Sequence, residues 1–159
     1  MDILLIPEEI SRYSRNISLP QVGLHGQKKL KAASVLIVGL GGLGSPAAIY
    51  LAAAGVGHLG LVDGDLVESS NLQRQIIHST AAIGQPKTKS ALAHLRQLNP
   101  HIHLDTYQEH LTRENALELI KPYQIILDAT DNIPSRYLLN DACHLTNKPL
   151  VHGLSLIHI

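Results

Sequence analysis

Short runs of consecutive apolar residues, many of them β-branched, recur along the chain with polar, helix-forming stretches between them. Runs of this length without polar alternation are typical of strands buried on both faces of a parallel sheet. The expected strands cover residues 34–38, 58–62, 102–108, 125–128 and 149–153. The expected helices cover residues 45–54, 87–98 and 134–146, with another capped by Thr112 and a helical lead-in over 8–31. This order predicts a Rossmann-like, doubly wound α/β fold with a mostly parallel sheet and helices on both faces.

A glycine-rich turn follows the first expected strand directly. Gly39, Gly41 and Gly44 match the pattern G-x-G-x-x-G, and Gly42 adds a fourth glycine. Glycines here permit a tight turn and close approach of the backbone to a ligand, while the helix start offers free N–H groups to a phosphate. Asp63 ends the next strand, about 20 residues on, where an acidic side chain holds ribose hydroxyls. The spacing predicts a nucleotide site.

The polar segment 70–74, Ser-Asn-Leu-Gln-Arg, narrows the kind of nucleotide. A dinucleotide dehydrogenase has no need of Asn71 and Arg74 beyond the acidic residue, whereas an enzyme that handles a triphosphate does. Arginine presents fixed planar donors that suit phosphate oxygens. Pro86 opens a helix in which Lys87 faces the crevice, where a lysine can hold β- and γ-phosphates. These residues favour ATP over NAD.

Polar residues also follow the fourth expected strand, at an edge where α/β sheets bind ligands. Asp131 is a candidate ligand of Mg²⁺ bridging phosphates, because Mg²⁺ takes one or two carboxylates and keeps several waters. Asp128 is expected to bond loop N–H groups, and Asn132 and Arg136 to cap and cover the next helix. Asp65 is expected to orient the segment that follows it.

The composition excludes several classes of function. Lys+Arg and Asp+Glu both number 13, and the chain has no Trp or Phe, so neither a basic nucleic-acid surface nor a stacking platform is expected. No apolar run is long enough to span a membrane. The single cysteine, Cys143, fits a reducing cytoplasm and reads as a buried apolar residue. His101 and His103 share a face of one strand, but we expect no metal site there.

Several motifs in the same order make the chain resemble the MoeB/ThiF/HesA adenylyltransferases, relatives of ubiquitin-activating enzymes. The matching segments are residues 12–15 (Arg-Tyr-Ser-Arg), 39–44, 63–65, 70–74, 85–87 (Gln-Pro-Lys), 99–100 and 128–132. The resemblance implies ATP and Mg²⁺, and adenylation of the C-terminal glycine of a ubiquitin-like sulfur carrier ending in Gly-Gly. Such carriers supply sulfur for molybdopterin or thiamin thiazole.

The resemblance also assigns roles to single residues. It places Gly42 against the phosphates, Asp63 at the ribose and Asp131 at the Mg²⁺ position. Arg15 resembles an arginine that reaches into the neighbouring subunit's site, which implies a homodimer. The nucleotide-binding residues implied are Gly39, Gly41, Gly42, Gly44, Asp63, Ser70, Asn71, Arg74, Lys87, Asp131 and Asn132. Those implied to act in catalysis are Arg15, Asn71, Arg74, Lys87 and Asp131.

The resemblance divides the chain into a lead-in (1–31), an incomplete adenylation domain (32–153) and a tail (154–159). The tail, Leu-Ser-Leu-Ile-His-Ile, reads as one frame of a transposon end used in sequencing libraries. We therefore expect a truncated record whose product is marginally stable, with weak ATP binding and little adenylation. The resemblance implies that a zinc site or a catalytic cysteine, where the family has one, belongs to the intact protein beyond residue 153, and no zinc ligands are expected in this chain.

Three alternatives remain open at the level of sequence. One is an NAD-dependent oxidoreductase domain, against which Arg74, Lys87 and Asp131 stand. Another is a non-catalytic module that binds a ubiquitin-like protein. The third is a relative that dehydrates threonylcarbamoyladenosine in tRNA, which shares these motifs.

Overall fold

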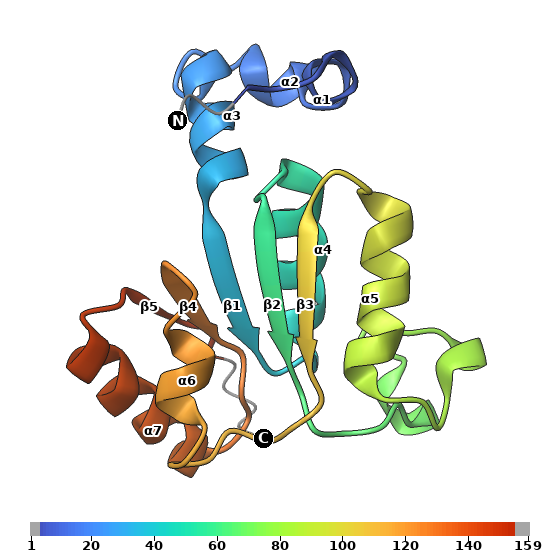
Figure 1. Cartoon of the computed structure of the whole chain (residues 1–159). Coiled ribbons are helices and arrows are strands. Elements are labelled where there is room, and N and C mark those ends of the chain that lie inside the picture. Colours follow the sequence, from blue (N-terminus) through green and yellow to red (C-terminus); the bar gives the residue numbers. More distant parts are fainter. Residues whose placement is uncertain (1–3, 155–159) are drawn as a thin grey trace.

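A five-stranded, all-parallel sheet forms the centre of the molecule (Figure 1). The computed structural model describes residues 4–154. The strand order is β3-β2-β1-β4-β5, so the chain starts in the middle, builds outward on one side and then returns to the other. The strands are β1 (Ser34–Val38), β2 (His58–Val62), β3 (His103–Tyr107), β4 (Ile125–Asp128) and β5 (Leu150–His152). The doubly wound fold expected from the apolar runs is confirmed.

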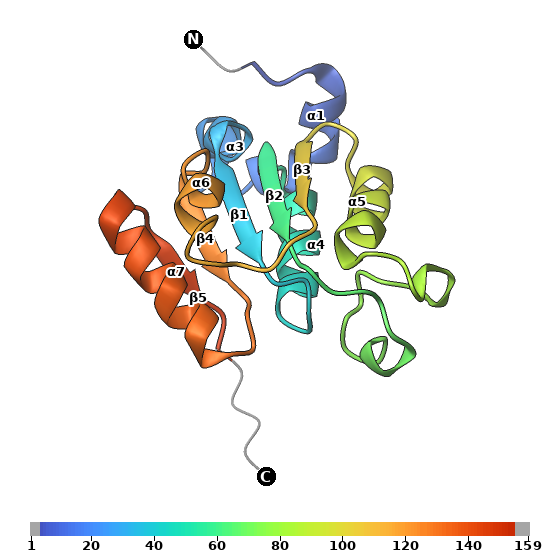
Figure 2. The same ribbon diagram turned by 60° about the horizontal axis from the view of Figure 1, so that its bottom comes forward.

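Helices cover both faces of this sheet, as Figures 1 and 2 show. α4 (Gly44–Ala54) and α5 (Lys87–Leu98) pack on one face through small and aliphatic residues such as Ala48, Ala52 and Leu95. α6 (Ala116–Ile120) and α7 (Ile133–Thr146) pack on the other. Because both faces are covered, all five residues of β1 are buried. This burial explains the unbroken apolar run in the sequence.

The lead-in folds as three short helices beyond the amino ends of the strands (Figure 1). They are α1 (Pro7–Arg12), α2 (Ser14–Ile17) and α3 (Gly23–Ala32). Tyr13, only 2% exposed, attaches them to the core. The amide of Asn99 donates to Tyr13 Oη and to the Ala52 carbonyl, both at 2.7 Å. The motif around residues 99–100 therefore holds the lead-in against the end of α4.

Several boundaries differ from the expectation, most of them by one residue, as at both ends of β3 and at the starts of α4 and α7. The helix expected from Thr112 begins at Ala116, although Thr112 and Asn115 do exchange backbone–side-chain hydrogen bonds in the turn before it. The last strand is only three residues long and pairs only with β4 among the described residues. The expectation about the tail falls largely on residues 155–159, outside the described part. No helix between residues 4 and 154 is long and apolar enough to cross a membrane.

Candidate nucleotide site

The glycine turn packs tightly between the ends of two strands. Gly39 has φ +96°, and a Cβ on it would lie 2.7 Å from the Ala129 carbonyl oxygen. A Cβ on Gly44 would lie only 1.8 Å from the Gly39 carbonyl oxygen. Side chains at these two positions are therefore sterically excluded, whatever binds nearby. Their requirement for glycine is structural, and Gly44 does not line the pocket described below.

Asp63, directly after the last residue of β2, holds this turn in place. Its Oδ2 accepts from the Leu40 backbone N–H at 2.7 Å, and its Oδ1 accepts from the Asp65 N–H at 2.8 Å. The carboxylate thus connects the glycine turn to the segment after β2. It also lines the pocket, so its predicted role at a ribose stays a prediction.

Lys87 points into the crevice from the first turn of α5, as expected. Its Nζ lies 2.8 Å from Asp65 Oδ2, and its backbone N–H donates to the Asp65 carbonyl at 3.0 Å. Lys87 is 6% exposed, whereas the Asp65 side chain is 55% exposed. The Lys87 ammonium is thus held by Asp65. If a ligand replaced Asp65 as the partner of Lys87, water could solvate the exposed Asp65 carboxylate.

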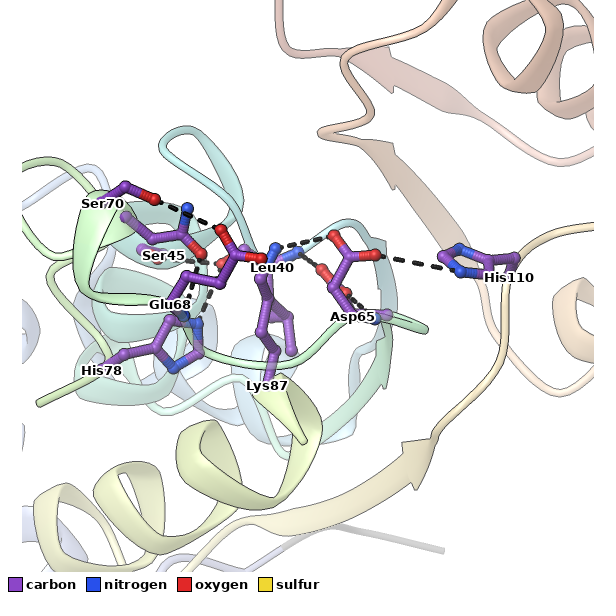
Figure 3. A network of polar contacts seen from close by, with 10 residues as sticks. Leu40, Ser45, Asp65, Glu68, Ser70, His78, Lys87 and His110 are labelled. Carbon is purple, nitrogen blue, oxygen red and sulfur yellow. Dashed lines mark hydrogen bonds and ion pairs between the residues drawn. The ribbon is translucent and has the colours of Figure 1, made fainter. Parts of the chain in front are cut away.

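The 70–74 segment forms a short 3₁₀ turn, η1 (Ser69–Asn71), followed by the arginine. Asn71 Oδ1 accepts from the Glu68 N–H at 3.2 Å, and Ser70 Oγ donates to Glu68 at 3.2 Å (Figure 3). Both side chains serve the turn, and neither lines the pocket. Arg74 does line it, and its Cδ lies 3.4 Å from where a Cβ on Gly42 would be.

A pocket of about 600 Å³ lies at the carboxyl ends of β1, β2 and β4. It is lined by Gly41, Gly42, Leu43, Asp63, Asp65, Arg74, Gln75, Lys87, Ala129, Thr130, Asp131 and Arg136. A smaller hollow of about 90 Å³ adjoins it and brings in Gly39 and Asn132. Three carboxylates and three cationic side chains therefore surround one cavity of the size typical for small-molecule ligands.

Some residues after β4 hold the loop and the start of α7 in place, and others line the pocket. Asp128 is fully buried and accepts from the Thr130 N–H and hydroxyl at 2.9 and 2.6 Å, as its predicted structural role requires. Asn132 caps α7 by accepting from the Ser135 N–H at 3.0 Å. Arg136 holds the Thr130 carbonyl at 2.6 Å, whereas Asp131 is exposed at the mouth of both hollows.

Gln75 and Arg136 are among the pocket residues to which sequence reasoning assigned no ligand role. Arg136 was expected only to cover a helix, and Gln75 carried no expectation. Gln75 is 4% exposed, and its Oε1 has no hydrogen-bond partner among the described residues. Gln75 directly follows Arg74, and Arg136 lies four residues after the cap residue Asn132. Neither position carries a signal by itself, because only the fold brings both side chains to the pocket.

Arg15 lies apart from these residues. It sits exposed on α2, beyond the amino ends of the strands, whereas the pocket is at their carboxyl ends. The described chain therefore does not bring Arg15 to its own pocket. Its predicted reach into a neighbouring subunit stays a prediction.

A buried histidine supports the glycine turn from the side of α5 (Figure 3). His78 Nε2 lies 3.2 Å from the Leu40 carbonyl oxygen, and Nδ1 lies 3.0 Å from Ser90 Oγ. Burial lowers the pKa of His78, and the charge of Lys87 acts in the same direction against the opposing Leu40 hydrogen bond. The folded state therefore resists protonation of a ring that the unfolded chain protonates readily.

Stability is expected to depend on pH through His78. The unfolded chain takes up the proton near pH ~6.5. The pKa of His78 in the folded state lies below that value. The free energy of unfolding should therefore fall as the pH decreases below about 6.5, whereas the contribution of His78 to stability is complete at higher pH. Urea denaturation at several pH values would measure this slope. His78→Gln, which cannot titrate, should flatten it; equal slopes in both proteins would contradict the assignment.

The family is identified by comparison with known proteins. Residues 13–156 match the model of the ThiF family. The chain is 55% identical over 149 residues to "Adenylyltransferase and sulfurtransferase MOCS3" of Anopheles gambiae and 55% identical over 152 residues to the protein of that name from Arabidopsis thaliana. These matches cover 94% and 96% of the chain but only 34% and 33% of the relatives. The chain thus spans about a third of their length.

Solved structures agree with this placement. E. coli tRNA N6-threonylcarbamoyladenosine dehydratase, TcdA, in complex with ATP superposes with a TM-score of 0.89 at 27% identity, covering 94% of this chain and 61% of that one. E. coli MccB with AMPCPP and MccA has a TM-score of 0.79 at 29% identity, with coverages of 91% and 43%. The identity, the fold and the residues around the glycine turn lead to one conclusion. The chain belongs to the ThiF family.

Proposed function

We propose that this chain is the ATP-binding part of an enzyme that adenylates the C-terminal glycine of a ubiquitin-like sulfur carrier. The convergence of Arg74, Lys87 and Arg136 on one pocket beside the glycine turn carries the proposal. Three cations at the carboxyl edge of a parallel sheet suit a triphosphate better than the two phosphates of NAD. The high identity to proteins named adenylyltransferase and sulfurtransferase supports it.

The residues present fit the nucleotide. Gly42 leaves the backbone of the turn open to phosphate. The Oε1 atom of Gln75 has no hydrogen-bond partner among the described residues, so it offers a buried acceptor to an N–H or O–H group of the nucleotide. Asp63 would bond ribose hydroxyls and Asp131 would hold Mg²⁺, and both side chains line the pocket. A bound Mg²⁺ would neutralise charge on the phosphates. Asn71 and Ser70 would contribute by keeping the turn that presents Arg74.

The proposed reaction needs no protein nucleophile. The carrier's terminal carboxylate forms a bond to the α-phosphorus while the bond to the leaving pyrophosphate breaks. Positioning the two reactants and stabilising the departing charge supply the catalysis. Lys87 and Arg74 are the groups expected to receive that charge. Cys143 is unsuited to covalent catalysis, because burial, aided by the Asp128 charge, raises its pKa and it is only 3% exposed.

The partners follow from this proposal. The carrier would present a flexible Gly-Gly end to the pocket mouth near Asp131. A second copy of the chain would contribute Arg15, which its own pocket does not use. Both statements concern the whole protein. They are guided by relatives of which this chain matches about a third.

Nucleotide binding tests the proposal most directly. We expect the 159-residue chain to bind ATP in a Mg²⁺-dependent manner and NAD at least about tenfold more weakly, measured by isothermal titration calorimetry. Equal or tighter binding of NAD would favour the oxidoreductase alternative. Pyrophosphate exchange by the whole protein should then require a Gly-Gly-ended carrier; carrier binding without exchange would favour the non-catalytic module.

A tRNA-modifying activity is the second candidate, because the ATP-bound TcdA structure superposes closely. The identity of 27% to it is half of that to the MOCS3 proteins, and the net charge of zero offers no basic surface for tRNA. If tRNA stimulated ATP consumption and the carrier did not, the tRNA-modifying activity would be favoured over carrier adenylation.

A further inference from the structure

A second cluster of polar side chains lies at the opposite end of the sheet from the nucleotide pocket. His58 and His103 are the first residues of β2 and β3, and they pair directly in the register of the two strands. Asp105 lies two residues further along β3, on the same face as His103. His58 Nε2 lies 2.8 Å from Asp105 Oδ2, and His103 Nε2 lies 3.0 Å from Asp105 Oδ1.

A tyrosine and a glycine next to this cluster hold Asp105 in position. Gly60 stands opposite Asp105, and a Cβ on it would lie 2.4 Å from Tyr123, so the ring can lie on the strand only because residue 60 has no side chain. From there the fully buried Tyr123 donates its hydroxyl to Asp105 Oδ2 at 3.2 Å, and its ring centroid lies 4.9 Å from that of His58. The hydroxyl oxygen of Tyr107 lies 3.1 Å from that of Tyr123, within hydrogen-bond distance. The carboxylate is therefore oriented by a second layer of residues.

We propose that His58, His103 and Asp105 form a binding site for a divalent transition-metal ion of the zinc class. One donor atom from each residue lies within 4.8 Å of the others. Two imidazoles and one carboxylate are ligands that zinc takes, at about 2.0–2.2 Å. Tetrahedral ligands at about 2.1 Å are about 3.4 Å apart. The two His–Asp contacts of 2.8 and 3.0 Å would therefore lengthen by about half an ångström, and the two imidazole nitrogens, which lie within 4.8 Å of each other, would settle to the same separation.

The surroundings agree with an open site rather than a closed one. The His103 side chain is 68% exposed, which leaves a fourth position for water. The hydrogen bond from Tyr123 to Asp105 is the kind of outer contact that orients a metal-binding carboxylate. An ion here would link the edge strand β3 to β2 and so hold the free edge of the sheet. The proposal is independent of the proposed adenylation.

Zinc titration of the chelator-treated 159-residue chain tests the site, with a chromophoric chelator as competitor. We expect one Zn²⁺ per chain, and visible absorption of tetrahedral Co²⁺ in the cobalt-loaded protein. His103→Ala and Asp105→Asn should each weaken zinc binding more than about tenfold. His144→Ala removes another exposed histidine, on α7, and should change nothing.

Thermal unfolding supplies a second, independent readout. Because a ligand that binds only the folded state stabilises it, Zn²⁺ should raise the Tm of the wild type and of His144→Ala but not of His103→Ala. Circular dichroism without metal should show that the His103→Ala protein remains folded, since His103 is exposed. The proposal is overturned if zinc binds the His103→Ala protein as tightly as the wild type, or if no stoichiometric zinc binds.

Discussion

Replacing Lys87 with methionine is expected to weaken ATP binding at least about tenfold while leaving AMP binding within about twofold of the wild type. A hydrogen bond to a charged group contributes about 1.5–3 kcal/mol, and about 1.4 kcal/mol corresponds to a factor of ten in affinity. The proposed contacts of Lys87 are to the β- and γ-phosphates, which AMP lacks. Calorimetric titration of both nucleotides with Mg²⁺ would measure the difference.

Methionine is chosen because it keeps an unbranched apolar stem where the lysine is buried. The abandoned Asp65 carboxylate is 55% exposed, so water can solvate it and the fold should survive. Lys89→Met is the matched control, because Lys89 is exposed on the same helix. Equal losses for ATP and AMP would show that the substitution damages the pocket as a whole, and no loss for either would remove Lys87 from the proposed triphosphate site.

Much of the fold could be predicted from the sequence because burial on both faces leaves an unbroken apolar run. β1, β2 and β4 were located to the residue for this reason. The edge strand β3 was predicted too long, because its exposed His103 and partly buried residues give no clear boundary. The helix expected at Thr112 starts at Ala116, since the same side-chain hydrogen bonds that signal a helix also stabilise a simple turn.

The site was predictable where spacing along the chain reflects proximity in space. The glycine turn, Asp63 and Lys87 all lie at strand ends or helix starts, and the structure brings them together. The partnership of Lys87 with Asp65 was not predictable, because the two residues are 22 positions apart and meet only through the way the loop between them folds back. Whether Asn71 touches a ligand also depends on that loop.

The proposed metal cluster shows the same limit more sharply. The sequence offered His101 and His103 as a pair on one strand, and that pair indicated no site. His103 instead meets His58, which is distant in the chain, through the parallel pairing of β2 and β3. Register between strands is not visible in a single sequence, so the third ligand, Asp105, had no partner to suggest it.

Gly44→Ala is expected to destabilise the fold by about 3 kcal/mol or more, because a methyl group would lie 1.8 Å from the Gly39 carbonyl oxygen. The turn cannot relax away, since Gly39 itself is held at φ +96° against Ala129. We expect this variant to be largely unfolded or insoluble, measured by urea denaturation and by the soluble yield. An unfolding midpoint equal to that of the wild type would contradict the steric argument.

Gly42→Ala should behave in the opposite way, and the pair separates the two reasons for glycine in this turn. The atoms nearest to a Cβ at residue 42 would belong to the flexible Arg74 side chain, at 3.4 Å, an ordinary contact distance, so the fold should persist. The methyl group would nevertheless enter the pocket where phosphate is proposed to approach the backbone. ATP binding should therefore weaken at least about tenfold in a folded protein. If Gly42→Ala instead bound ATP normally, the phosphates would not lie against this part of the turn, whereas the steric role of Gly44 would stand.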